Sequence, residues 1–115
     1  MKKISLTGIK PTGIPHIGNY FGAIKPAIEF SNSSEFDSFF FIADYHALNQ
    51  LNTKQELQEY TKILACTWLA CGLNPSRVLL YRQSRIPEIT ELCWILTNVT
   101  PKGLMDRAHA YKGAV

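Results

Sequence analysis

The sequence holds 115 residues, of which 46% are hydrophobic, and its formal net charge is +3, which fits one modest domain that buries roughly two-thirds of its unfolded surface. The positive excess lies after residue 76, but three charges are too few to indicate nucleic-acid binding. No stretch approaches the ~20 apolar residues of a membrane span, and the first residues lack the apolar core of a secretion signal, so we expect a cytoplasmic protein without membrane segments.

The chain opens with strand and loop signals. An apolar run begins at Ile4–Leu6 and meets a stretch rich in glycine and proline over residues 7–18, which predicts a strand followed by a loop. From Ile17 the apolar residues recur at helical spacing, and Pro26 should kink this helix or end its regular part. Polar residues 31–35 predict a turn before the next apolar segment.

The second strand and the second helix have clear boundary signals. Residues Phe39–Ile42 are uniformly apolar, as expected for a parallel strand that is buried on both faces. Thr53 and Glu56 have the spacing of a helix capping box, and Gly72 stands where a left-handed residue commonly ends a helix. Between them apolar residues recur at steps of three and four, which predicts one broad buried face that includes Trp68.

A third strand and further helices complete the pattern. Val78–Tyr81 is a short apolar run, and Pro87 suits the first position of a helix that continues to Thr97. Thr100 and the proline after it repeat this start signal. We expect the helix to direct its apolar side chains inward, namely Ile89, Leu92, Cys93 and Leu96, with Trp94 also in the core.

The three cysteines do not form a recognisable framework. Cys66, Cys71 and Cys93 are odd in number, and no pair has the two-residue spacing of a zinc or redox site. This pattern favours buried thiols in a reducing compartment, and we expect no metal site built from protein side chains.

Taken in order, these elements predict an α/β fold. A strand, helix, strand, helix, strand succession is the first half of a Rossmann-like doubly wound parallel sheet, here followed by helices. In such sheets the first strand is central, and its second neighbour comes from the other half of the domain. We therefore expect one edge of the first strand to be open, which invites oligomer formation or strand swapping.

The first candidate site is the stretch Gly8–Tyr20, between the first strand and the first helix. Phosphates bind where backbone amides and a helix N-terminus converge, and Gly18 would let a ligand approach the main chain closely. His16 and Asn19 lie three apart on a helical turn, so both could donate hydrogen bonds to one oxyanion. The alternative is a glycine-rich surface turn with a capping histidine, since the stretch is neither a P-loop nor a GxGxxG fingerprint.

The second candidate site follows the strand Phe39–Ile42. Asp44 and His46 stand at the carboxyl end of this strand, where open α/β sheets bind their ligands. These two side chains could orient a substrate, or they could simply cap the short helix that follows the strand.

Together these motifs resemble the class I aminoacyl-tRNA synthetases, and specifically the tryptophanyl enzymes. Residues 7–23, TGIKPTGIPHIGNYFGA, are similar to the signature of that family, in which the class-wide HIGH sequence ends in Asn. Asp44–Ala47, Leu69–Gly72 and Gln83 with Ser84 fall at the intervals that the family shows. The ending TPKGLMDRAHAYK at Thr100–Lys112 is similar to the segment leading into the family's dimer-forming insertion.

The resemblance implies ATP-dependent activation of L-tryptophan and its ligation to tRNA(Trp), with Mg²⁺ accompanying the ATP. By this likeness His16 and Asn19 are the catalytic residues, and the residues that contact ATP are Lys10, Pro11, Thr12, Gly18 and Asn19. The residues expected to line the tryptophan pocket are Leu6, Gly8 and His46. Lys10 stands where many members have Gln, and Leu6 stands at a position that is often aromatic.

By the same resemblance, residues 1–115 correspond to the amino-terminal half of the nucleotide-binding catalytic domain, with the last ~30 residues leading into the insertion. A homodimer is implied. Because the sequence contains no KMSKS-type loop and no anticodon-binding helices, we expect this polypeptide alone not to aminoacylate tRNA. The alternatives are a tyrosyl-tRNA synthetase-like enzyme and a non-catalytic module for nucleotide binding or dimerisation.

Overall fold

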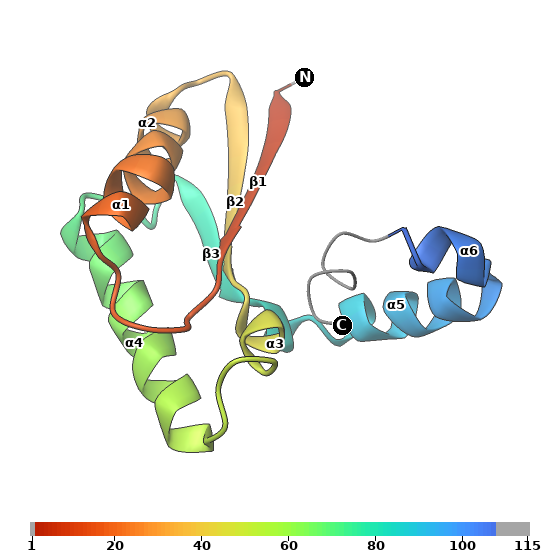
Figure 1. The fold of residues 1–115 in the computed structure, drawn as a ribbon. Coiled ribbons are helices and arrows are strands. Elements are labelled where there is room, and N and C mark those ends of the chain that lie inside the picture. The colour runs from red at the N-terminus through yellow and green to blue at the C-terminus, as the bar shows by residue number, and fades with distance from the viewer. Residues whose placement is uncertain (1, 108–115) are drawn as a thin grey trace. The chain divides into compact units, whose positions relative to one another are not determined.

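The computed structural model describes residues 2–107 and contains a three-stranded parallel sheet (Figure 1). The strands are β1 (Lys3–Ile9), β2 (Phe36–Ile42) and β3 (Val78–Arg82), in the order β1-β2-β3. Leu6 pairs with Phe39, which in turn pairs with Leu79 on β3. The predicted α/β fold with parallel strands is confirmed, and β1 lies at an edge of the described sheet, as expected from the fold class.

The first crossover is a helix with an irregular middle. It consists of α1 (Ile17–Asn19), the π-helical segment η1 (Tyr20–Ile24) and α2 (Lys25–Asn32). Pro26 has no amide hydrogen, and the wider turn of η1 immediately before it lets the helix continue to Asn32. The sequence therefore located the irregularity correctly, while the structure shows that the helical path continues past Pro26 to Asn32.

The second crossover contains α3 (Asp44–Ala47) and α4 (Lys54–Ala70). At the start of α4, the Thr53 hydroxyl oxygen accepts a hydrogen bond from the Glu56 amide at 3.2 Å. Just beyond its end, Gly72 has a φ of +99°, the left-handed conformation that glycine adopts without strain. Both predicted boundaries of this helix are confirmed.

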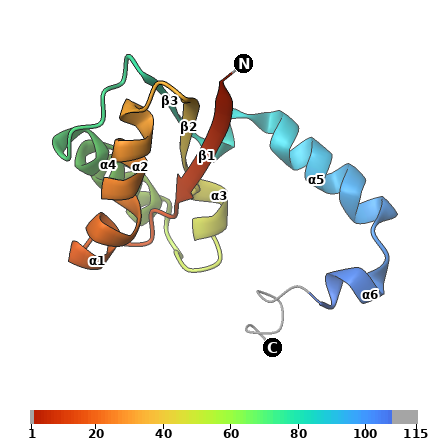
Figure 2. The same ribbon diagram turned by 90° about the horizontal axis from the view of Figure 1, so that it is seen from above.

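The helices α2 and α4 lie together on one face of the sheet and form the core with it (Figure 2). Phe40 stacks on Trp68 with 5.0 Å between the ring centroids. The other buried core residues are Ile24, Ala27, Ile28, Ile42, Leu64 and Leu73. Burial of these side chains accounts for the apolar residues at the alternate positions 40 and 42 of β2 and for the helical periodicity of α4.

The opposite face of the sheet is left largely uncovered by the described residues. On β1, Ile4 and Leu6 are 74% and 63% exposed, and on β3 Leu79 is 55% exposed. Phe39 and Phe41 of β2 are half-buried, whereas Phe40 and Ile42 on the covered face are buried. The expectation that β2 is buried on both faces is therefore wrong for the described part of the chain, because α2 and α4 cover the same side.

The chain divides into two compact units, Met1–Arg85 with the sheet and Ile86–Val115 with α5 (Pro87–Val99) and α6 (Lys102–Met105). Pro87 opens α5 as predicted, but the expected inward face is wrong: Leu92, Cys93 and Leu96 are exposed and Ile89 only half-buried. Trp94, expected in the core, is 70% exposed, because its unit has no second layer among the described residues. Residues 108–112 of the family-like ending lie outside the described range.

The cysteines also differ from expectation. Cys66 and Cys93 are exposed, and Cys71 is half-buried, so the prediction of buried thiols is wrong for the first two. Cys66 lies two positions from both Leu64 and Trp68, which places it on the opposite side of α4 from the core. In residues 2–107 no helix combines the length and the apolar composition needed to cross a membrane.

Candidate functional site

A pocket of about 210 Å³ lies at the carboxyl end of β1, beside the start of the first crossover helix. Four of the residues expected to contact ATP or to act in catalysis line it, and α4 contributes one apolar side chain, Leu64. The full lining is Ile9, Lys10, Thr12, Gly13, Ile14, Pro15, His16, Asn19 and Leu64. The structure thus brings Lys10, Thr12, His16 and Asn19 together around one cavity.

His16 and Asn19 form a reciprocal capping box at the start of α1. The His16 Nδ1 atom accepts a hydrogen bond from the Gly18 amide at 3.1 Å, and the Asn19 Oδ1 atom accepts one from the His16 amide at 2.9 Å. These bonds use the acceptor atom of each side chain. The remaining polar atoms, His16 Nε2 and Asn19 Nδ2, are therefore the donors, and they belong to side chains that line the pocket.

Two other members of the expected ATP set support the turn without lining the pocket. A Cβ atom on Gly18 would lie 2.9 Å from His16 Cε1, so glycine leaves room for the imidazole that caps the helix. The Gly18 amide is engaged by this same imidazole. The Pro11 side chain is fully buried. In this structure both residues shape the turn through packing.

The expected tryptophan-pocket residues lie apart from this cavity. Leu6 and Gly8 occupy alternate positions of β1 and share the uncovered face of the sheet. A Cβ atom on Gly8 would lie 2.3 Å from the Phe41 ring, which therefore packs directly on the Gly8 backbone. Phe41 also stacks on Tyr81, with ring centroids 5.8 Å apart. Gly8, Phe41 and Tyr81 form one row across the three strands.

His46 and Asp44 join the ends of β2 and β3. The His46 Nδ1 atom lies 3.0 Å from Oε1 of the buried Gln83, and with the amide oxygen as acceptor Nδ1 carries the hydrogen. The buried Asp44 carboxylate accepts hydrogen bonds from the Ser84 hydroxyl and from the Ser84 amide, the latter at 2.9 Å. Ala43 holds the N-cap position of α3, so Asp44 is no N-cap, and its carboxylate mainly ties two strand ends together.

The role of Gln83 and Ser84 was not visible from the sequence pattern alone. Ser84 lies 40 residues from Asp44, and Gln83 lies 37 residues from His46. The one available signal was topological, since residues that follow neighbouring parallel strands meet at the same edge of a sheet.

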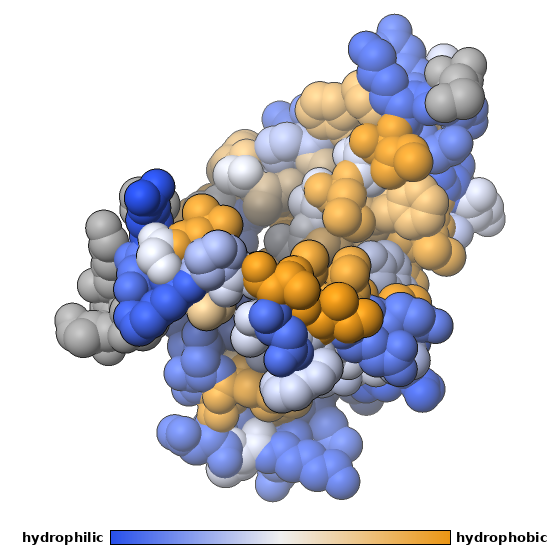
Figure 3. Space-filling model, turned by 90° about the vertical axis from the view of Figure 1, so that its right-hand side faces the viewer, coloured by the Kyte–Doolittle hydropathy of each residue, from blue (hydrophilic) through white to orange (hydrophobic). Residues whose placement is uncertain are grey.

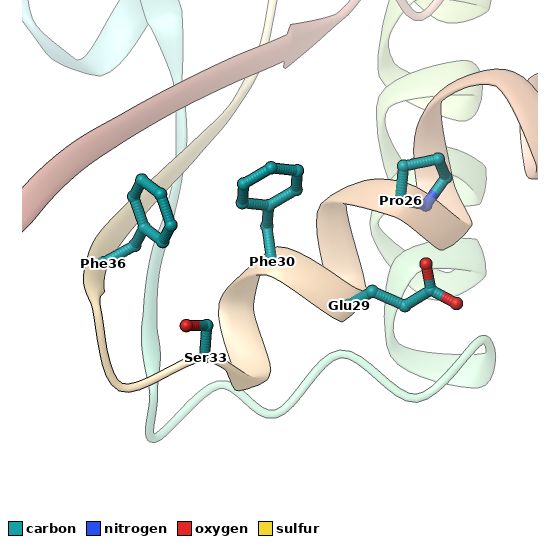
Figure 4. Close-up of a pocket in the computed structure, with 5 residues that line it drawn as sticks. All are labelled: Pro26, Glu29, Phe30, Ser33 and Phe36. Carbon is teal, nitrogen blue, oxygen red and sulfur yellow. The ribbon is translucent and has the colours of Figure 1, made fainter.

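A second depression, of about 290 Å³, lies along α2 and the start of β2 (Figure 4). Its apolar part is formed by Phe30 and Phe36, whose rings meet edge to face with centroids 5.2 Å apart. Glu29 points away from these rings and lies 3.9 Å from the Lys25 ammonium. None of the candidate site residues lines this depression, and it shares no lining residue with the candidate nucleotide site.

Comparison with known proteins decides the family. The model of the family described as tRNA synthetases class I (W and Y) matches residues 2–115. The chain belongs to this family. The tryptophan–tRNA ligase of Bordetella pertussis is 62% identical over 110 residues, which cover 96% of this chain and 24% of the relative. The chain thus spans about a quarter of the length of that synthetase.

Solved synthetase structures agree with the described fold. The tryptophanyl-tRNA synthetase of Campylobacter jejuni complexed with ADP and tryptophan has a TM-score of 0.87 and 40% identity, covering 96% of this chain and 34% of that one. The tyrosyl-tRNA synthetase of Archaeoglobus fulgidus has a TM-score of 0.73 at 22% identity, covering 87% of this chain and 32% of that one, and it shares the fold alone. The resemblance to the amino-terminal part of a tryptophanyl-tRNA synthetase is therefore confirmed.

Proposed function

We propose that the protein containing this chain is a tryptophan–tRNA ligase, and that this chain supplies the turn that holds ATP. The activity is ATP-dependent activation of L-tryptophan, followed by its transfer to tRNA(Trp). The His16–Asn19 capping box is the main support for this proposal. Its hydrogen bonds occupy the acceptor atoms of both side chains, so the donor atoms of these pocket-lining residues remain free to bind phosphate. The likeness to a synthetase solved with ADP and tryptophan supports this choice of ligands.

In the activation step the carboxylate oxygen of tryptophan forms a bond to the α-phosphorus of ATP. The bond from that phosphorus to the bridging oxygen breaks, and pyrophosphate leaves. Negative charge builds on the phosphoryl oxygens in the transition state, so fixed hydrogen-bond donors lower the barrier. His16 Nε2 and Asn19 Nδ2 act as these donors, while Lys10 and Thr12 contact the nucleotide from the loop.

Magnesium accompanies the nucleotide in this proposal. Among residues 2–107 no three His, Cys, Asp or Glu side chains come close enough together to hold a metal ion. Mg²⁺ commonly keeps several water ligands and is bound through substrate phosphates, so it fits a site whose lining offers an ammonium, a hydroxyl and neutral donors. When bound, it neutralises charge on the leaving pyrophosphate.

Tryptophan is assigned to the uncovered face and the strand ends. Leu6 and Gly8 supply an apolar surface on β1, and the absence of a side chain on Gly8 lets the Phe41 ring lie over the strand. His46 is held by Gln83, which fixes the orientation of its ring. Its polar edge is then available to the amino acid at the carboxyl end of the sheet.

The remaining partners follow from the same activity. tRNA(Trp) is the second substrate, and the protein acts in the cytoplasm as a homodimer. The last ~30 residues of this chain lead into the dimer-forming insertion. The separation of the chain into two units at residues 85 and 86 supports a distinct role for this last segment.

Pyrophosphate exchange with the full-length protein tests the assignment of His16 and Asn19. Asn19→Asp and His16→Asp both keep an oxygen that accepts the capping hydrogen bond, but each removes the donor that faces the phosphates. We expect tryptophan-dependent exchange to fall by ~10²–10³-fold in each variant, as on loss of an oxyanion donor. The thermal midpoint should change little.

Two controls make this result specific. Asn49→Ala removes an exposed amide in a turn outside the pocket and should leave exchange unchanged. Tyrosine in place of tryptophan should give background exchange. Normal exchange in both aspartate variants would refute the roles of His16 and Asn19, and equal exchange with tyrosine would refute the substrate.

A further inference from the structure

A cavity of about 480 Å³ lies between β3 and α4, within the first unit. This volume falls in the range of small-molecule sites, roughly 300–1,000 Å³. This cavity shares no lining residue with the nucleotide pocket, although α4 borders both, the nucleotide pocket through Leu64. The lining residues that matter here are Lys62 and Arg82 at the polar part and Ile42, Ala65 and Leu80 at the apolar part.

The apolar part of this cavity belongs to the edge of the hydrophobic core. Ile42 is 2% exposed, and Ala65 and Leu80 are half-buried against the core cluster. On α4, Thr61 and Ala65 are four residues apart and therefore lie on the same side of the helix. A ligand with a flat or short apolar body would cover surface here that the described residues leave partly open to water.

The polar part carries two positive charges from different elements. Lys62 comes from α4 and Arg82 from the end of β3, and no Asp or Glu lines the cavity. Among residues 2–107 neither side chain has a carboxylate within 4.0 Å, whereas Lys2, Lys25 and Lys102 each have one. Arg82 and Lys62 can both donate hydrogen bonds to a carboxylate or phosphate.

We propose that this cavity binds a small organic anion, an aryl carboxylate or aryl phosphate whose apolar body rests on Ile42, Ala65 and Leu80 and whose charged group contacts Lys62 and Arg82. The two cations are complementary to the anionic group, and the apolar floor is complementary to the ring. The site goes beyond the ATP and tryptophan sites and stands on residues that neither of them uses.

The probe for this site is 2-naphthoate, with neutral 2-naphthamide as its control. Both are titrated into the ¹⁵N-labelled full-length protein while amide shifts are recorded. We expect naphthoate to shift the amides of residues 61–65 and 80–82, and naphthamide to bind about two- to fivefold more weakly, since exposed charge interactions are modest. Equal binding of both probes, or shifts that appear elsewhere, would overturn the proposal.

Substitutions test whether the charges of Lys62 and Arg82 contribute to binding of the probe. Lys62→Gln and Arg82→Gln should each weaken naphthoate binding about two- to fivefold. Lys54→Gln on the same helix lies outside the cavity and should change nothing. Ala65→Leu should block binding by filling the apolar floor. His16→Asp should weaken ATP binding while leaving naphthoate binding intact. A negative result for naphthoate binding can therefore be told apart from a negative result for the proposed ligase function.

Discussion

At the scale of single residues, two glycines of the signature region, Gly8 and Gly18, leave room for side chains of the protein itself. Gly8 receives the Phe41 ring and Gly18 receives the His16 imidazole, with Cβ positions 2.3 and 2.9 Å from these groups. The sequence suggested close approach at Gly18, but the approaching group could not be known, since it depends on the rotamer of a neighbouring side chain. In this structure the capping imidazole takes that place.

Replacing Gly8 tests the packing of Phe41 on β1. Gly8→Ala forces the Phe41 ring to move, and we expect the free energy of unfolding to fall by about 1–3 kcal/mol, as in overpacked cores. Urea denaturation measures this change. Gly22→Ala is the matched control, because nothing lies within 4 Å of its Cβ position, and helical alanine should stabilise by about 0.5–1 kcal/mol. Similar effects at the two positions would contradict this view of Gly8.

At the scale of elements, the sequence predicted features that depend on neighbouring residues better than contacts between residues far apart in the chain. The boundaries of α4 were recovered because a cap and a left-handed glycine are each encoded within a few residues. The pocket members Lys10, Thr12, His16 and Asn19 are also near neighbours in the chain. The bonds of Asp44 and His46 could not be derived in this way, since their partners lie 40 and 37 residues away.

The connection between the ends of β2 and β3 is testable at Ser84. Ser84→Ala removes the hydroxyl that donates to the buried Asp44 carboxylate, while the Ser84 amide remains. We expect the free energy of unfolding to fall by about 1–3 kcal/mol, because a buried charged acceptor loses one donor. Denaturant unfolding measures it, with exposed Ser34→Ala as control. A change below about 0.5 kcal/mol would mean that this connection contributes little.

At the scale of the whole molecule, exposed apolar surface is the main departure from the sequence prediction. Apolar side chains form orange patches on the side of the molecule drawn in Figure 3. In the first unit, Ile4 and Leu6 on β1 and Leu79 on β3 are exposed on the uncovered face of the sheet. The sequence identified these residues as apolar, but which side α2 and α4 would cover depends on the packing of the chain.

An open sheet face and an unpaired edge should favour self-association of this chain in isolation. We expect sedimentation equilibrium at tens of micromolar to give an average mass above 13.0 kDa. Leu6→Lys combined with Leu79→Lys should lower this mass, whereas Leu48→Lys, which is exposed but lies in a turn, should leave it unchanged. A single 13.0 kDa species at the highest soluble concentration would contradict the expectation.

A crystal structure of the full-length protein with a non-hydrolysable ATP analogue tests most directly whether the turn capped by His16 and Asn19 holds the triphosphate. We expect phosphate oxygens within about 3.2 Å of His16 Nε2 and Asn19 Nδ2, with Lys10 and Thr12 beside the nucleotide. A triphosphate bound elsewhere, with the turn free of ligand in the same crystal, would contradict this expectation.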